Sequence, residues 1–366
     1  MKILLLGEYS NLHWTIAEGF RTLGHEVVVA SGGDRFKNYR RDIDLHRDSY
    51  GIMGKVSFGY KLLKEIRNFR GYDIVQIINP MFLDVKAKTN LEIYNYLKKH
   101  NNKVFLGAFG VDYFWIKACF DRKTFRYSEF YIEDKPTNMP SALYLKEQWI
   151  GTDKERVNKI MAETCDGIIA CLYEYFVSYD KIYAEKLAYI PEPVNLSDIA
   201  FSDKGQNEKL RFFIGIQKER SEIKGTDVLY KVLKDVNNKY PQTSAIVKAE
   251  SLPYADYLKA MNGSDVMLDQ LYSYTPAMNA FAAMAQGLVV VGGGEPEGYE
   301  LLEEYENRPV VNVIPDEQDI FDKLEGLLLN KKEIPSLSLK SRQFVEKHHD
   351  HIKVARQYMD FWSSKL

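Results

Sequence analysis

The sequence predicts an α/β protein built from two doubly wound parallel sheets. Continuous apolar segments, typical of strands buried on both faces of a sheet, alternate with amphipathic segments along most of the 366 residues. This alternation occurs twice, on either side of a polar stretch at residues 199–209. At about 150 residues per domain, the length also fits two domains.

The composition is that of a globular protein, with 45% hydrophobic and 27% charged residues. The 49 basic and 51 acidic residues leave a net charge of −2, which excludes nucleic-acid binding through bulk charge. No apolar run reaches the roughly 18 residues of a membrane span, and Gly7 and Glu8 interrupt the apolar start. We therefore expect a cytoplasmic protein with reduced cysteines.

The first predicted domain covers residues 1–198. Short apolar runs predict strands, and segments with a 3.6-residue period predict helices. The predicted strands are residues 2–7, 26–30, 72–78, 103–106, 167–171 and 187–190, and the predicted helices are residues 12–23, 56–69, 87–100, 154–164 and 173–182. Two segments break the alternation, a charged stretch at 33–50 and a loop-rich, aromatic stretch at 107–151. Such a long irregular insertion is usually functional or covers a site.

The second predicted domain covers residues 210–337. Its predicted strands are residues 212–216, 244–248, 266–269, 288–291 and 310–314, and its predicted helices are residues 225–239, 254–261, 276–285, 297–305 and 317–329. Thr275 as an N-cap followed by Pro276 predicts the start of the third helix. A last helical segment, 338–366, ends in aromatic residues, which we expect to pack back on the first domain.

Two facing sheets of this kind predict a shared cleft, because ligands bind beyond the carboxyl ends of parallel strands. The first strand leads into Gly7, which permits a tight turn, and then into Glu8, Asn11 and His13. A dinucleotide-binding turn needs three glycines and this one has a single glycine, so an ordinary strand–helix turn is the alternative. A lone histidine such as His13 is more often structural than catalytic.

A second candidate on this side is GAFGVDYF at 107–114, which follows a buried strand. Its two glycines allow the backbone to approach a ligand closely. Asp112 stands just beyond the strand end, where its carboxylate would bind substrate hydroxyls or orient an acceptor. The alternative is that Asp112 caps a helix.

In the second domain, a strand ends near Gly215 and a charged loop leads to a helix. Cations beside a helix N-terminus form a site for phosphate oxygens, so we expect Lys218, Arg220 and Lys224 to bind phosphate. A solvated charged face is the alternative.

The segment 265–302 is the most informative one. A strand ends at Asp269, and the loop after it carries Tyr272 and Tyr274. The free amides at the start of the next helix suit a diphosphate, and they belong to Ala277, Met278 and Asn279.

The order KGTD, a strand, DVMLDQ, a helix ending in AMAQG and a strand VVV resembles the C-terminal domain of GT-B glycosyltransferases, in particular retaining family 4. The N-terminal half, from MKILLLG through GAFGVD, is similar to that family's acceptor-binding domain, so the resemblance covers essentially the whole chain. It implies a GT-B fold with two Rossmann-like domains facing a central cleft. It also implies a hexosyltransferase of polysaccharide biosynthesis that moves a sugar from a nucleotide-diphosphate sugar to a glycan or lipid-linked glycan.

The resemblance further implies that Lys224 and either Arg220 or Lys218 bind the donor diphosphate. The family carries two glutamates with seven residues between them, but these positions read Tyr274 and Ala282 here. The second glutamate binds the nucleotide ribose, and its alternatives in this chain are Glu295, Glu297 and Tyr272.

Catalysis needs few protein groups if the reaction retains configuration, as the resemblance implies, because the acceptor attacks on the face of the departing phosphate. An inverting reaction would need a base such as Asp112, Glu8 or His13. No cofactor and no metal are expected, since no DxD pair stands at a strand end and the consecutive HHDH at 348–351 lacks the spacing of a zinc site.

Two rival functions remain open, a sugar-nucleotide epimerase of similar fold and a degenerate sugar- or nucleotide-binding subunit. A basic, aromatic helix at 55–70, with further cations at 35–41, would lie on an anionic membrane surface at the cytoplasmic face. The alternative is that this helix packs only on its own sheet.

Overall fold

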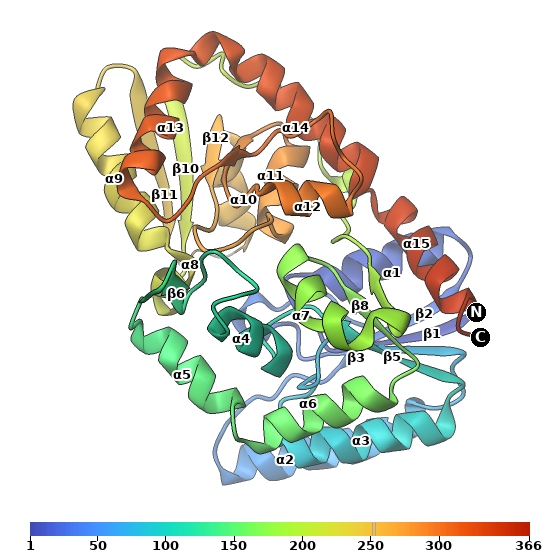
Figure 1. The fold of residues 1–366 in the computed structure, drawn as a ribbon. Helices are drawn as coiled ribbons and strands as arrows, with labels where there is room; N and C mark the ends of the chain where they lie inside the picture. The colour runs from blue at the N-terminus through green and yellow to red at the C-terminus, as the bar shows by residue number, and fades with distance from the viewer. Residues whose placement is uncertain (251, 253) are drawn as a thin grey trace.

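Two parallel sheets organise the chain, as a computed structural model shows for residues 1–250, 252 and 254–366 (Figure 1). The strands of the first sheet are β1 (Lys2–Leu6), β2 (Glu26–Ser31), β3 (Ile43–Asp44), β4 (Ile74–Ile77), β5 (Lys103–Ala108), β8 (Gly167–Ala170) and β9 (Leu187–Tyr189). The helices of this half are α1 (Leu12–Thr22), α2 (Ile52–Glu65), α3 (Ala87–His100), α4 (Tyr113–Phe120), α5 (Pro140–Trp149), α6 (Asp153–Thr164) and α7 (Tyr173–Tyr183).

The second sheet contains β10 (Leu210–Ile216), β11 (Ser244–Glu250), β12 (Val266–Leu268), β13 (Val289–Gly292) and β14 (Val311–Asn312). Its helices are α8 (Ser221–Lys224), α9 (Thr226–Lys239), α10 (Tyr254–Asn262), α11 (Met278–Ala285), α12 (Pro296–Leu301) and α13 (Glu317–Leu329). The chain ends in α14 (Ile334–His348) and α15 (His351–Ser363).

Both sheets are doubly wound. The strand orders are β3-β2-β1-β4-β5-β8-β9 and β11-β10-β12-β13-β14, and the strands pair in parallel. The order reverses direction beside β1 in the first sheet and beside β10 in the second, and such reversal points are where α/β sheets bind ligands. The predicted fold class is confirmed.

The insertion at 107–151 is more regular than predicted. It contains α4, α5 and a hairpin of β6 (Tyr131–Ile132) and β7 (Lys135–Pro136). Helix α4 escaped the sequence analysis because six of its eight residues are buried, so it shows no apolar period. Pro140 stands at the start of α5, where the fixed φ of proline is favourable.

The last helical segment is divided in two where the prediction had one helix. Val194, in the linker between the sheets, donates its N–H to His349 O at 2.6 Å and accepts from His351 N at 3.0 Å. This pairing interrupts the helix, and Asp350 then caps α15 by accepting from Ile352 N at 3.1 Å. Helix α12 is also shorter than predicted, since it ends at Leu301.

Helix α15 packs back on α1 of the first domain, beside both chain ends in Figure 1. Trp362 is fully buried there, and its ring lies 5.0 Å from that of Phe20 and 5.9 Å from that of Phe105. The C-terminal residues thus complete the first hydrophobic core. None of the helices described is both long and apolar enough to cross a membrane.

Truncating Trp362 to alanine tests this crossing. The lost ring leaves a cavity in the first core, so Trp362→Ala should lower the free energy of unfolding by about 3–5 kcal/mol. Urea denaturation measures the effect. The matched control is Tyr305→Ala, an aromatic residue that is 67% exposed, which should change stability by less than about 0.5 kcal/mol. Equal effects of the two variants would contradict the packing.

Candidate active site

The strand ends of the two sheets face one another, and charged side chains from both sheets interact across the space between them. The charge of Arg220, from the loop after β10, acts on the Tyr9 hydroxyl at the end of β1. The charges of Lys37 and Asp34, which follow β2, act on the Lys224 side chain. We take this region as the candidate active site.

The turn after β1 is held by its own side chains. Gly7 has a φ of +85°, and a Cβ there would come within 2.3 Å of Ile78 Cγ2. The Glu8 carboxylate caps the first turn of α1, accepting from His13 N at 3.2 Å and from Trp14 N at 2.9 Å. His13 Nδ1 lies 2.8 Å from Gly7 O, and because a carbonyl only accepts, Nδ1 carries the proton.

Burial sets the ionisation of both side chains. Desolvation raises the pKa of Glu8 to about 8 and lowers the pKa of His13 to about 3. His13 is therefore neutral at physiological pH. Of the predicted acceptor-side residues, Gly7, Glu8 and His13 lie beneath the turn, and Asn11 lines a cavity.

Asp112 is the N-cap of α4, the alternative that the sequence left open. One carboxylate oxygen accepts from Trp115 N at 2.9 Å, and the other accepts from the Tyr179 hydroxyl at 2.6 Å. The residue is fully buried, and this burial raises its pKa to about 6. Both oxygens are thus engaged within the first domain.

The basic loop after β10 separates its three cations. Lys218 is exposed and pairs with Glu250 of β11 at 2.8 Å. Arg220 is exposed, and Lys224 is half-buried next to it. Desolvation, together with the charge of Arg220, lowers the pKa of Lys224 to about 8, and the nearby carboxylate of Asp269 opposes this effect. Arg220 and Lys224 are therefore the two cations that converge.

Close packing shapes the backbone on both sides of this loop. A Cβ on Gly215 would come within 2.7 Å of the Tyr257 ring. Gly225 has a φ of +65°, and a Cβ there would meet Leu271 at 2.5 Å and the Tyr272 ring at 3.0 Å. Tyr272, predicted on the donor side, is accordingly buried against this glycine.

Helix α11 begins at Met278 with Ala277 as its N-cap, two residues later than predicted. The start moves because the Thr275 hydroxyl donates to Glu174 Oε2 at 2.7 Å instead of capping its own helix. Backbone N–H groups at this start meet protein carboxylates. Burial raises the pKa of the Asp269 carboxyl and raises that of Glu192 to about 8, and the nearby N–H groups of Ala277 and Met278 oppose this effect only in part.

Glu174 is a functional candidate that the sequence analysis missed. It stands in the first turn of α7, and its carboxylate crosses to the loop before α11. It accepts from the N–H of Tyr274, from Thr275 N at 3.1 Å and from Ser273 Oγ at 2.8 Å. A charged residue just after strand β8 was the available signal, because that is where the strand-end rule looks.

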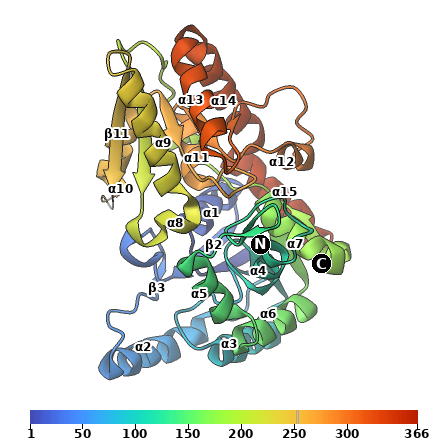
Figure 2. The same ribbon diagram turned by 60° about the vertical axis from the view of Figure 1, so that its left-hand side comes forward.

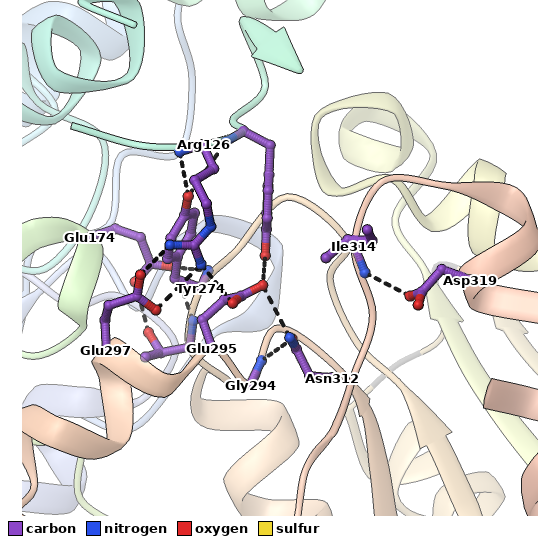
Figure 3. Close-up of polar contacts among 11 residues, drawn as sticks. Arg126, Glu174, Tyr274, Gly294, Glu295, Glu297, Asn312, Ile314 and Asp319 are labelled. Carbon is purple, nitrogen blue, oxygen red and sulfur yellow. Dashed lines mark hydrogen bonds and ion pairs between the residues drawn. The ribbon is translucent and has the colours of Figure 1, made fainter. Parts of the chain in front are cut away.

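A second bridge joins the insertion to the C-terminal sheet (Figure 3). Arg126 lies between Glu295, at 2.6 Å from Oε2, and Glu297, with which it also pairs. The Tyr127 hydroxyl donates to Glu295 Oε1 at 2.8 Å, and Arg126 N donates to the Tyr274 hydroxyl at 2.6 Å. Glu297, predicted on the donor side, is thus engaged by Arg126. Burial alone would raise the Glu297 pKa, but the hydrogen bond and charge of Arg126, together with a backbone hydrogen bond, lower it.

A cavity of about 740 Å³ opens between the domains on the linker side. Such a volume is ordinary for a small-molecule site. Asn11 lines it from the first domain, and Asn279, Ala282 and Gln286 line it from one face of α11. Position 282, where the family that this chain resembles has its ribose-binding glutamate, therefore lies on the cavity wall.

The remaining polar motif, HHDH at 348–351, has separate structural roles. His348 Nε2 lies 2.7 Å from Glu304, and His349 stacks on Phe281 with its Nδ1 at 2.8 Å from Glu192 O. Within the described residues, no three His, Cys, Asp or Glu side chains group as metal ligands, and all three cysteines are free and buried.

Replacing Glu174 with glutamine tests the inter-domain bridge. Glutamine keeps the size, but its amide NH₂ faces donors, so Glu174→Gln should lower the free energy of unfolding by about 2–4 kcal/mol. Small-angle X-ray scattering should also show a larger radius of gyration, because the variant loses a contact that holds the two domains together. Glu300→Gln, the same change at an exposed position, is the control. A Glu174 variant that matches this control in both measurements would contradict the bridge.

Comparison with known proteins finds a matching family. Residues 211–360 match the family described as "Glycosyl transferase-like". No curated protein matches the sequence.

Solved structures share the fold over the full length. HepE from Anabaena, in complex with UDP and glucose, is 13% identical with a TM-score of 0.61, and 100% of each chain is covered. Sucrose-phosphate synthase from Thermosynechococcus elongatus is 11% identical with a TM-score of 0.65, covering 100% of this chain and 99% of that one. WaaG, a glycosyltransferase involved in lipopolysaccharide biosynthesis, is 14% identical with a TM-score of 0.55, covering 98% and 99%.

These comparisons confirm the predicted resemblance to GT-B glycosyltransferases, and the matched domain agrees with the predicted enzyme class; membership of family 4 itself stays a prediction. The two doubly wound sheets are the two Rossmann-like domains of the GT-B fold. The chain carries a glycosyl transferase-like domain at residues 211–360 and shares the GT-B fold of these glycosyltransferases over its full length.

Proposed function

We propose that the protein transfers a hexose from a nucleotide-diphosphate sugar to a glycan or lipid-linked glycan in the cytoplasm, as a family 4 enzyme of polysaccharide biosynthesis. The convergence of Arg220 and Lys224 beyond the end of β10 carries this proposal. Neither side chain forms a salt bridge with any residue that the structure describes. Two adjacent cations without a salt-bridge partner are typical of a site for a phosphate-bearing ligand.

The proposed chemistry rests on stabilising the leaving group. Breaking the anomeric C–O bond leaves negative charge on the nucleoside diphosphate while the sugar gains oxocarbenium character. Arg220 and Lys224 would hold that charge where it develops, with no metal required. The acceptor hydroxyl then attacks the anomeric carbon and passes its proton to the departing phosphate.

The state of the candidate bases supports retention of configuration. An inverting reaction needs a base that reaches the acceptor, but Glu8 and Asp112 are buried and accept hydrogen bonds from their own helices. His13 is fully buried and neutral. A retaining reaction, in which the leaving phosphate takes the proton, makes no such demand.

The donor nucleotide would extend from the two cations into the cavity beside α11. In place of the glutamate that is absent at 282, Asn279 and Gln286 offer side-chain amides from the same helix face. Glu297 is engaged by Arg126, and Tyr272 is buried against Gly225, so neither is free to bind a ribose. HepE forms a complex with UDP-glucose, which makes UDP sugars the first donors to test.

A second candidate, a degenerate nucleotide-binding subunit, is favoured by one observation. The N–H groups at and just before the start of α11 already face carboxyl groups of the protein: Glu174 accepts hydrogen bonds there, and Asp269 and Glu192 lie nearby. A donor must displace or rearrange at least one of them.

A thermal-shift panel of UDP, GDP, ADP, CMP and their sugars, followed by product detection, separates these functions. A transferase is stabilised by one nucleotide and forms product only with an acceptor, whereas an epimerase converts the sugar nucleotide alone. A degenerate subunit binds without turnover. If no nucleotide raises the melting temperature, the proposal fails.

Removing the Lys224 cation should weaken donor binding. Lys224→Ala loses a charge-assisted contact to the diphosphate, so the donor Kd should rise about 10- to 100-fold and turnover should fall with it. Calorimetric titration measures the Kd. Lys332→Ala removes the same charge from an exposed position and is the control. Wild-type affinity in the Lys224 variant would show that the diphosphate binds elsewhere.

Donor affinity should also depend on pH in a direction set by Lys224. Its pKa of about 8 in the free enzyme lies below that of a free lysine, so the side chain loses its charge as the pH rises through 8. The donor Kd should therefore increase between pH 7 and 9. Lys224→Arg keeps its charge over this range, so its Kd should change much less. Parallel pH profiles for the two proteins would contradict the role of Lys224.

A further inference from the structure

Helix α2 presents apolar side chains on two faces. Phe58 and Leu62 are buried and pack in the first core, as expected for a helix that covers a sheet. A second row faces solvent, with exposures from 69% to 86%, and consists of Ile52, Met53, Val56, Tyr60 and Leu63. At about 100° per residue, this row forms a single stripe roughly 100° wide, away from the buried pair. We call it the α2 stripe.

The α2 stripe is unusual for a soluble surface helix, whose outer face is normally polar. Contiguous exposed apolar surface generally marks a contact with a partner or a membrane. Figures 1 and 2 show α2 at the outer edge of the first domain, away from the second domain. No described part of the chain covers the stripe, since its five members remain solvent-accessible.

The charges around the stripe have one dominant sign. Lys55, Lys64, Arg67 and Arg70 are exposed, and none of them forms a salt bridge with a residue that the structure describes. Glu65 is the single acidic residue between positions 51 and 70. Its carboxylate accepts a hydrogen bond from Asn68.

We propose that the α2 stripe docks on an anionic membrane surface, with α2 lying parallel to that surface. The five apolar side chains would enter the boundary between headgroups and acyl chains while the flanking cations bind lipid phosphates. Lysine and arginine stems suit this position because they carry the charge outward from an apolar base. The uncompensated positive charge opposes pairing with a second copy, since two such helices would bring like charges together.

This docking goes beyond the proposed reaction and does not rest on it. It would hold the first domain, which is the predicted acceptor side, against the surface where a lipid-linked acceptor lies. Vesicle co-sedimentation tests it with the full-length protein. Vesicles of phosphatidylcholine mixed with phosphatidylglycerol should bind the protein at least about tenfold more tightly than vesicles of phosphatidylcholine alone.

Two variants separate the apolar and the charged contributions. The triple variant Met53→Ser, Val56→Ser, Leu63→Ser removes the centre of the stripe, and the double variant Lys64→Glu, Arg67→Glu reverses flanking charge. Each should weaken binding to the anionic vesicles at least about tenfold. Leu329→Ser, at a leucine that is 66% exposed on α13, is the control and should bind as the wild type does. Circular dichroism verifies that each variant is folded.

Several results would overturn the proposal. These are a wild-type protein that binds neither kind of vesicle, a triple variant that binds as well as the wild type, and a charge reversal without effect. A wild-type dimer in sedimentation velocity that the triple variant converts to a monomer would assign the stripe to a second copy instead. The nucleotide thermal shift should be the same in all variants, so a failure of membrane binding is distinguishable from a failure of the proposed reaction.

Discussion

The buried carboxylate of Glu174 is the interaction on which the geometry of the cleft depends. It leaves the first domain and is bound by two backbone N–H groups and two hydroxyls of the loop before α11. A buried carboxylate is stable only when its lone pairs are satisfied, so the loop and the first domain must stay together. The start of α11, the position of Tyr274 and the approach of the insertion all follow from this contact.

The Arg126 bridge extends the same contact outward. Tyr274 stacks between Tyr127, at 4.8 Å, and Tyr173, at 5.5 Å, and its hydroxyl accepts from Arg126 N. The tyrosine thus stands where the family that the chain resembles has its first glutamate, and here it has an aromatic, inter-domain role. Carboxylates that would otherwise face a donor are used for holding the two domains together, while Arg220 and Lys224 keep their charge without a salt bridge. The cleft therefore combines a closed side at the insertion with an open cavity on the linker side.

The order of strands and helices was largely predictable. Buried parallel strands are continuous apolar runs, and this signal is local, so β1, β2, β10 and β13 lie within about two residues of their predicted bounds. Predictions from local sequence patterns were wrong where a residue distant in the sequence forms hydrogen bonds with the element. The sequence predicts Thr275 as an N-cap, but its hydroxyl donates to Glu174, about a hundred positions away. The last helix is interrupted because backbone groups of Val194 form hydrogen bonds with its middle. Helix α4 was missed because burial on all sides removes its periodicity.

The sequence by itself determined the fold class, the strand ends at which a ligand is expected and the basic, aromatic character of α2. These depend on short-range patterns of burial, glycine and charge. Only the tertiary structure decided which polar residues near strand ends face the cleft. Glu8 and Asp112 cap their own helices, whereas Lys224 and Glu174 reach the opposite domain or its edge. The physical reason is that a polar side chain takes whichever partners satisfy it when buried, and those partners come from anywhere in the chain.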